Sequence, residues 1–163
     1  MPHLDAAFNL ASWLVRNEHD ARDVVQEAFL RAFKFFDGFH GTNGRSWLLT
    51  IVRNTSFNWL RKQRKNQDHA AFDEELHGLE NAPGEPLAPL LQGAEREMVR
   101  AALEQLPVEF REVTILRELE EMSYKEIAEI IGVPIGTVMS RLARGRKQLQ
   151  SRLTERMRQE RSL

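Results

Sequence analysis

The sequence predicts an all-α protein made of two small helical domains joined by a flexible acidic linker. Apolar residues recur at helical spacing in the first third of the 163-residue chain and again in its last third. Between these parts, prolines and acidic residues interrupt the pattern. A chain of this length is sufficient for two small domains. The expected boundaries are residues 1–67, 68–98 and 99–163.

The distribution of charge supports the same division. The formal net charge of the chain is -1, which on its own argues against a nucleic-acid partner. Residues 1–67 hold ten basic and six acidic residues, residues 68–98 one and eight, and residues 99–163 twelve and ten. Residues 141–163 alone hold eight basic and two acidic residues. The near-neutral total therefore conceals two basic ends around an acidic middle.

Composition and motifs exclude several other classes of protein. The chain has no cysteine, so it has no disulfide, no Cys-ligated metal and no thiol nucleophile. Neither a signal peptide nor a run of about 18 apolar residues is present, so we expect a soluble cytoplasmic protein without a membrane segment. The five histidines never form a zinc motif, and phosphate-loop and nucleophile-elbow motifs are absent. We therefore expect no enzymatic activity, metal or cofactor.

Residues 20–36 have apolar side chains at i, i+3, i+4 and i+7, which predicts a helix with a broad buried face. Asp20 is the expected N-cap, and Gly38 and Gly41 are expected to end the segment. The predicted buried face consists of Ala21, Val24, Val25, Ala28, Phe29, Ala32, Phe33 and Phe36. The polar residues of one turn on the opposite face are Asp23, Gln26 and Glu27. Taken alone, such a turn is most often only a solvated surface.

Residues 45–65 predict a second helix with two distinct faces. The expected buried residues are Trp47, Leu48, Ile51, Val52, Thr55 and Trp59. The other stripe carries Arg53, Asn54, Phe57, Asn58, Arg61, Lys62, Arg64 and Lys65. Aromatic rings stack on unpaired bases, basic groups follow phosphates and amides bond to base edges, so this stripe suits melted DNA or RNA. The alternative is a basic helix end with Phe57 and Trp59 in the core.

The middle of the chain is expected to be extended. Pro83, Pro86 and Pro89 follow one another at three-residue spacing, which is incompatible with a helix interior or a central strand. The acidic stretch before them has too few apolar residues to form a core. The segment is either a solubilising spacer or a tether between two modules that reach separate sites.

Residues 123–142 predict a helix-turn-helix. Ser123 and Glu126 have the spacing of a capping box, and Gly132 is placed to end the first helix. Thr137 is the expected N-cap of the second helix. The small residue Ala128 allows the two helices to approach closely, and Val138 is expected to pack between them. This arrangement is typical of DNA-binding proteins, although a plain helical hairpin with a basic tail is the alternative.

The second helix of this motif carries the expected DNA contacts. Its first turns should face base edges in the major groove. The candidates there are Thr137, Ser140, Arg141 and Arg144. Basic residues further along the helix are better placed for phosphates. These are Arg146, Lys147 and Arg152.

With these motifs in hand, the chain resembles the extracytoplasmic-function (ECF) sigma factors of the sigma-70 family, which contain only regions 2 and 4. Residues 20–33 are similar to the region 2 helix that docks on core RNA polymerase. Residues 46–65 match the helix that melts the promoter and recognises the −10 element. Residues 106–149 resemble region 4, which binds the −35 element. The resemblance implies a promoter-specific transcription initiation factor with core RNA polymerase and promoter DNA as partners.

The resemblance also assigns roles to individual residues. Asp23, Gln26 and Glu27 would contact core polymerase. Phe39 and Asn54 would form the pocket for a flipped −10 base, with Arg53, Asn58, Arg61 and Lys62 along the same helix. Ser140 and Arg144 would face the −35 major groove. Relatives are often held inactive by an anti-sigma factor, which is a possible further partner.

Two other classes of function remain open at this point. One is a helix-turn-helix regulator that binds DNA by itself as a dimer. The other is an adaptor of two protein-binding helical modules. A dimeric regulator would need a long apolar dimerisation helix, and the residues after 150 are too polar to provide one.

Overall fold

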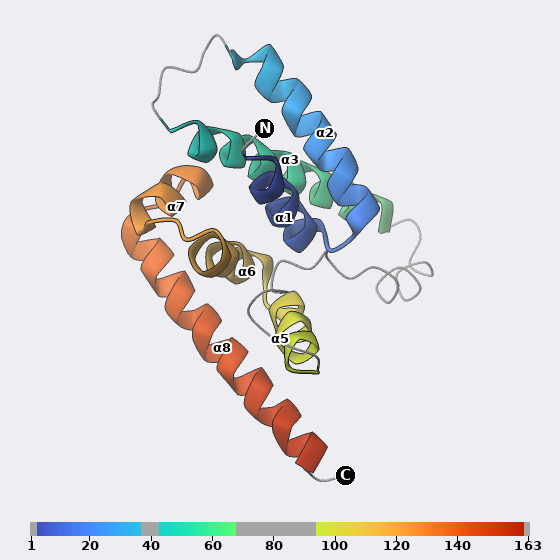
Figure 1. The fold of residues 1–163 in the computed structure, drawn as a ribbon, viewed down its shortest axis with the longest axis vertical. Helices are drawn as coiled ribbons and strands as arrows, with labels where there is room; N and C mark the ends of the chain where they lie inside the picture. The colour runs from blue at the N-terminus through green and yellow to red at the C-terminus, as the bar shows by residue number, and fades with distance from the viewer. Residues whose placement is uncertain (1–2, 37–42, 68–93, 162–163) are drawn as a thin grey trace. The chain divides into compact units, whose positions relative to one another are not determined.

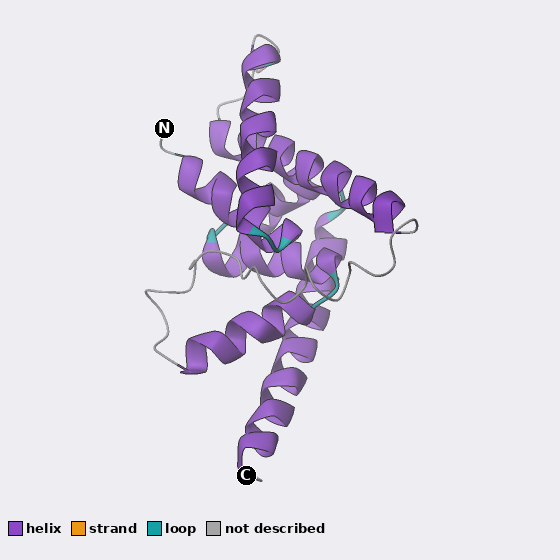
Figure 2. Ribbon diagram, turned by 90° about the vertical axis from the view of Figure 1, so that its right-hand side faces the viewer, coloured by secondary structure: helices purple, strands orange, loops and turns teal. Residues whose placement is uncertain are grey.

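The computed structural model describes residues 3–36, 43–67 and 94–161, and every regular element in these ranges is helical. The helices are α1 (Leu4–Val15), α2 (Glu18–Lys34), α3 (Gly44–Gln67), α5 (Ala94–Gln105), α6 (Val108–Thr114), the π-helix η2 (Ile115–Leu119), α7 (Tyr124–Ile131) and α8 (Ile135–Arg161). Helices α1 to α3 form one compact unit, and α5 to α8, apart from the last turn of α7, belong to a second (helices labelled in Figure 1). The predicted all-α fold is confirmed, since Figure 2 shows only helices and loops in the described residues.

The first unit is a bundle in which α1, α2 and α3 all pack against one another. Its best-buried large side chains are Leu10, Trp13, Leu14, Val24, Leu49 and Val52. Burial of one such side chain contributes about 1.5–3 kcal/mol. Helix α1 was not among the helices predicted from the sequence, although Ala7, Leu10, Ala11 and Leu14 have helical spacing and are buried.

Helix α2 begins earlier than predicted. Asn17 has an extended backbone, and its Oδ1 accepts a hydrogen bond from the Asp20 N–H at 3.1 Å. The prediction of Asp20 as the N-cap is therefore wrong, because Asn17 caps the helix one turn before. The helix ends at Lys34, and Gly38 and Gly41 lie outside the described residues.

The buried face of α2 is narrower at its C-terminal end than predicted. Its alanines and valines are buried as expected, and Phe29 is half-buried. The prediction is wrong for Phe33 and Phe36, which are 87% and 63% exposed. Ala32 occupies the contact position of the last turn, so Phe33 lies outside it. Phe36 follows the end of the helix, where its ring makes an edge contact with Trp47 at a centroid distance of 6.3 Å.

Helix α3 begins after Asn43, whose Oδ1 accepts a hydrogen bond from the Ser46 N–H at 3.1 Å. The predicted inner face is buried or half-buried along its whole length. Leu49 and Ser56 are also fully buried, which the sequence pattern did not predict. The Ser56 hydroxyl donates to the Val52 carbonyl at 2.7 Å, so its burial leaves no unpaired group.

In the second unit, α8 packs against α5 and α6. Gly145 marks the crossing of α8 and α6, because a Cβ atom there would lie 3.0 Å from the Thr114 Oγ1 and 3.5 Å from the Phe110 Cβ. The turn between α5 and α6 is held by the buried Arg111, whose Nη1 donates to the carbonyls of Glu104 and Leu106 at 3.0 Å. The close approach at Gly145 thus brings α8 against α6, and Arg111 holds the turn that joins α6 to α5.

Helices α7 and α8 form the predicted helix-turn-helix. The capping box is confirmed, since the Ser123 and Glu126 side chains each accept the other's backbone N–H at 3.1 Å. Gly132, with φ 73°, ends α7 in the left-handed region. The prediction of Thr137 as the N-cap is wrong, because α8 begins at Ile135 and the Thr137 N–H donates to the Pro134 carbonyl at 3.0 Å.

The predicted linker is only partly covered by the structure. Helix α5 begins at Ala94, so residues 94–98, which composition placed in the linker, are helical. Residues 68–93 lie outside the described residues, as does Phe39.

Candidate nucleic-acid interface

The polar turn of α2 is exposed as predicted. Asp23, Gln26 and Glu27 lie on the side of the helix away from its buried alanines and valines. The Glu27 carboxylate accepts a hydrogen bond from the Arg31 Nη2 at 2.8 Å, an exposed pair within one helix. The sequence pattern therefore located this face correctly.

An apolar surface continues this polar turn along α2. Leu30 is 68% exposed and lies three and four positions after Glu27 and Gln26, and the exposed Phe33 lies three positions after Leu30. Exposed large apolar side chains that adjoin polar groups are typical of protein-binding surfaces. This extension was not predicted from the sequence, because helical spacing alone placed Phe33 in the core.

The second stripe of α3 is accessible and held by contacts within the helix. The Arg53 guanidinium lies over the Phe57 ring at 4.1 Å, and its Nη1 donates to the Asn54 Oδ1 at 3.4 Å. The Arg61 Nη2 donates to the Asn58 Oδ1 at 2.9 Å. Lys62 and the basic residues after it are exposed. Phe57 is half-buried under the arginine, so its ring is not enclosed in the core.

Helix α8 presents a second basic face. Ser140, Arg144 and Lys147 are exposed, while Thr137 and Arg141 are half-buried in the first turns. The Ser140 hydroxyl donates to the Thr137 carbonyl at 3.1 Å, which leaves its lone pairs available to a donor. The structure thus brings together all the residues predicted to face base edges.

Two residues predicted to contact phosphates are bonded to other parts of the second unit. The Arg146 Nη2 donates to the Glu118 Oε1 at 2.7 Å, and the Arg152 Nη1 donates to the Gln105 Oε1 at 2.9 Å. The hydrogen bond to Glu118, together with its charge, raises the pKa of Arg146. Sequence reasoning missed both partners, because they lie 28 and 47 residues away along the chain.

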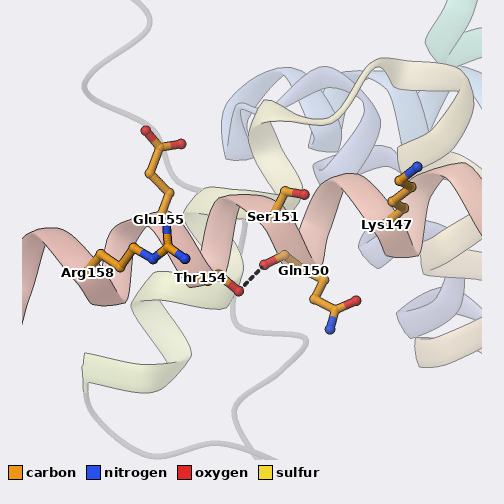
Figure 3. Close-up of a pocket in the computed structure, with 6 residues that line it drawn as sticks. All are labelled: Lys147, Gln150, Ser151, Thr154, Glu155 and Arg158. Atoms are coloured by element: carbon orange, nitrogen blue, oxygen red, sulfur yellow. Dashed lines mark hydrogen bonds between the residues drawn. The ribbon is translucent and has the colours of Figure 1, made fainter.

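A shallow hollow lies further along α8 (Figure 3). It is lined by Lys147, Gln150, Ser151, Thr154, Glu155 and Arg158, all from this one helix. The Thr154 hydroxyl donates to the Gln150 carbonyl at 2.8 Å, which is a bond within the helix. The hollow is therefore the surface between successive side chains, and we assign it no ligand.

The described residues provide neither a metal site nor a membrane span. They contain no group of three or more His, Asp or Glu side chains that could hold a metal ion. Within the same ranges, no helix has the length and apolar character needed to cross a membrane.

Comparison with known proteins shows the family of the chain. Residues 1–66 match the family model of Sigma-70 region 2, and residues 96–149 match that of Sigma-70, region 4. The chain is 35% identical over 141 residues to the ECF RNA polymerase sigma-E factor of Escherichia coli K12, covering 82% of this chain and 74% of that protein. The chain belongs to the ECF sigma factors of the sigma-70 family.

Further relatives are consistent with this assignment. This chain is 33% identical over 156 residues to the ECF RNA polymerase sigma factor SigE of Mycolicibacterium smegmatis, and the alignment covers 94% of this chain. It spans only 59% of the length of that relative. Since both halves match sigma models, the comparisons do not favour a stand-alone helix-turn-helix regulator.

Two solved structures resemble the whole chain. One is the sigma factor RpoE of Bartonella quintana in complex with the anti-sigma factor NepR, with a TM-score of 0.74 and 29% identity. The alignment covers 93% of this chain and 91% of the RpoE chain. The other is CnrH in complex with the cytosolic domain of CnrY, with a TM-score of 0.66, 25% identity and coverage of 94% and 84%.

Proposed function

We propose that this sigma factor binds core RNA polymerase and directs it to promoters by recognising a duplex −35 element and a melted −10 element. The observation that carries the proposal is the presence of two exposed basic helical faces, on α3 and α8, in two different units of one chain. An exposed polar face on α2 precedes them in the sequence. The proposal involves no enzymatic activity, since every assigned residue binds a partner.

The core polymerase would bind α2. Asp23, Gln26 and Glu27 supply acceptors and one amide, and the exposed Leu30 and Phe33 supply apolar area beside them. Interfaces of this kind gain most of their binding energy from a few buried apolar or aromatic groups within a polar rim. Binding to polymerase would also place the sigma factor in the cytoplasm.

The −10 element would be captured along α3. Asn54 and Asn58 offer amide groups to base edges, and the Arg53–Phe57 pair offers a flat surface on which a base can stack. Arg61 and Lys62 would follow the backbone phosphates. Capture of a flipped base must offset an unstacking cost of a few kcal/mol. Phe39, outside the described residues, would complete this pocket.

The −35 duplex would be bound by α8. Thr137, Ser140, Arg141 and Arg144 occupy the first turns of the recognition helix, where a helix-turn-helix contacts bases. Arg146 and Lys147 lie one turn further, where contacts to phosphates are expected. Arginine forms bidentate pairs with guanine, so Arg144 is the strongest candidate for a sequence-specific contact.

The segment between the two units would act as the linker. Residues 68–98 carry eight acidic residues and one arginine, so they would suit a positively charged channel of the polymerase. The domain boundaries that accompany this proposal are residues 1–67 and 99–163, with the second domain extended at its start by the helical residues 94–98. An anti-sigma factor is a further expected partner, because the solved relatives RpoE and CnrH are each in complex with another protein.

The experiment that tests the proposed function is reconstitution with core RNA polymerase. We expect the full chain to co-purify with core enzyme and to support run-off transcription from promoters selected by the resulting holoenzyme. Absence of core binding, combined with tight binding of the chain alone to duplex DNA, would contradict the proposal. A matched pair of variants sharpens the test: Asp23→Arg should weaken core binding, and Asp5→Arg on α1 should not.

A further inference from the structure

A cluster of side chains joins η2, α7 and α8 on the surface of the second unit. The Arg146 Nη2 of α8 donates to the Glu118 Oε1 of η2 at 2.7 Å. The guanidinium of Arg117, also on η2, lies over the Tyr124 ring at 4.6 Å. The Arg117 Nη1 donates to the Met122 carbonyl at 2.9 Å. These contacts connect the recognition helix to the two elements that precede it.

The backbone of η2 is unusual where it carries this cluster. The Glu120 N–H donates to the Ile115 carbonyl at 3.1 Å, a bond between residues five apart. A wide turn of this kind rotates the residues after it by about 100° relative to a regular helix, and such turns are frequent at functional sites. Arg117 and Glu118 both lie within this wide turn.

We propose that Glu118 is a positioning residue for DNA binding: it holds the Arg146 guanidinium so that its other N–H groups are presented to a phosphate of the −35 duplex. This inference rests on the proposed function of α8. Glu118 does not itself contact DNA in this account. It acts through Arg146.

The chemistry of arginine supports such a role. A guanidinium has five N–H donors in a fixed plane, and one hydrogen bond to Glu118 leaves the others available. The Arg146 side chain is 55% exposed, so these donors are accessible from solvent. An arginine already held in one orientation loses less rotamer freedom when it binds a phosphate.

The surroundings of Arg146 also favour its charged form. The hydrogen bond and the charge of Glu118 raise the pKa of Arg146, and Tyr124 adds a smaller contribution in the same direction. Tyr124 is in turn contacted by η2, because the Arg117 guanidinium packs on its ring. The guanidinium is therefore stabilised as a cation by groups from two neighbouring elements.

If Glu118 acted only as a negative charge, its effect on DNA binding would be opposite to the effect expected of a positioning residue. A carboxylate close to a phosphate repels it, so removal of Glu118 would strengthen binding if the residue were only a nearby negative charge. Positioning predicts weaker binding when Glu118 is removed. The sign of the change therefore separates the two explanations.

The test uses holoenzyme formed from the full chain and core RNA polymerase, with duplex DNA selected from a random-sequence library by the wild-type holoenzyme. Glu118→Ala should weaken binding several-fold and lower the slope of log K against log salt concentration by about 1, the contribution of one phosphate contact. Glu118→Gln retains an acceptor oxygen and should restore most of the affinity and the slope. In an Arg146→Ala background, Glu118→Ala should have no further effect.

Control measurements distinguish positioning from other causes. Glu109→Ala, which removes an exposed carboxylate of α6, should not weaken binding. Tighter binding by Glu118→Ala with an undiminished slope would overturn the inference, as would loss of binding by Glu118→Ala that persists in the Arg146→Ala background. Failure of the wild-type chain to form holoenzyme would instead overturn the proposed function.

Discussion

The two long helices that carry the proposed DNA contacts, α3 and α8, hold their polar side chains in different ways. On α3 the pairs are local, as in Arg53 over Phe57 and Arg61 bonded to Asn58. On α8 two arginines are bonded to residues of other elements, Arg146 to Glu118 and Arg152 to Gln105. These contacts of α3 lie within the helix itself, whereas those of α8 join it to other elements of its unit.

This difference fits the two kinds of DNA that the helices are proposed to bind. A melted strand is flexible and can adapt to a row of rings, amides and cations. A duplex presents phosphates and base edges at fixed positions, so its reader must be held in a defined orientation. The tertiary contacts of α8 provide that orientation.

The largest expected effect concerns the core beneath α3. Leu49→Ala should lower the free energy of unfolding by about 2–5 kcal/mol, because Leu49 is fully buried and its loss leaves a cavity. Leu30→Ala removes the same atoms from an exposed site of α2 and should change stability by less than about 0.5 kcal/mol. Urea unfolding of both variants measures the difference. Equal effects would contradict the described packing of the first unit.

A second prediction tests whether the packing of α8 controls its function. Gly145→Val should destabilise the protein by about 1–3 kcal/mol, because the Gly145 position is in close contact with Thr114 and Phe110 on α6. It should also weaken −35 duplex binding, although Gly145 is buried and does not itself face the DNA, because α8 would be displaced from α6. Gly136→Ala places its methyl group in open space and should not be destabilising. Thermal unfolding and duplex binding by the holoenzyme would be measured together.

A third prediction concerns the local surface of α3. Phe57→Leu should reduce affinity for single-stranded −10 DNA roughly tenfold, since stacking on one aromatic ring contributes about 1–3 kcal/mol. Leucine keeps an apolar side chain at this half-buried position, so the unfolding transition should change little. Fluorescence anisotropy with holoenzyme would detect the change. An unaltered affinity would indicate that the Arg53–Phe57 pair is only structural.

The smallest expected effect lies in the turn between η2 and α7. Glu121 has φ 54°, a left-handed conformation that a non-glycine residue adopts at a cost of about 1–2 kcal/mol. Glu121→Gly should therefore raise stability by about 0.5–1 kcal/mol. Glu121→Ala retains the Cβ atom and should give no such gain. Differential scanning calorimetry has the sensitivity needed to compare the two.

The sequence allowed prediction of the features that depend on neighbouring residues. The Ser123–Glu126 capping box, the end of α7 at Gly132 and the polar turn of α2 are each encoded within a few positions. The same periodicity placed Phe33 in the core, because spacing cannot indicate where the partner helices end. The Glu118–Arg146 pair could not be predicted from the sequence for a related reason, since it depends on how η2 and α8 pack.

The most direct test of the central claim compares Asn54→Ala and Arg144→Ala in the same promoter complex. Permanganate reactivity of thymines reports melting at the −10 element, and nuclease protection reports occupancy of the −35 duplex. We expect Asn54→Ala to lose melting while keeping −35 protection, and Arg144→Ala to lose −35 protection at a holoenzyme concentration where wild type protects fully. If each variant lost both signals equally, or if the two losses were exchanged, the assignment of α3 to melted DNA and α8 to duplex DNA would be contradicted.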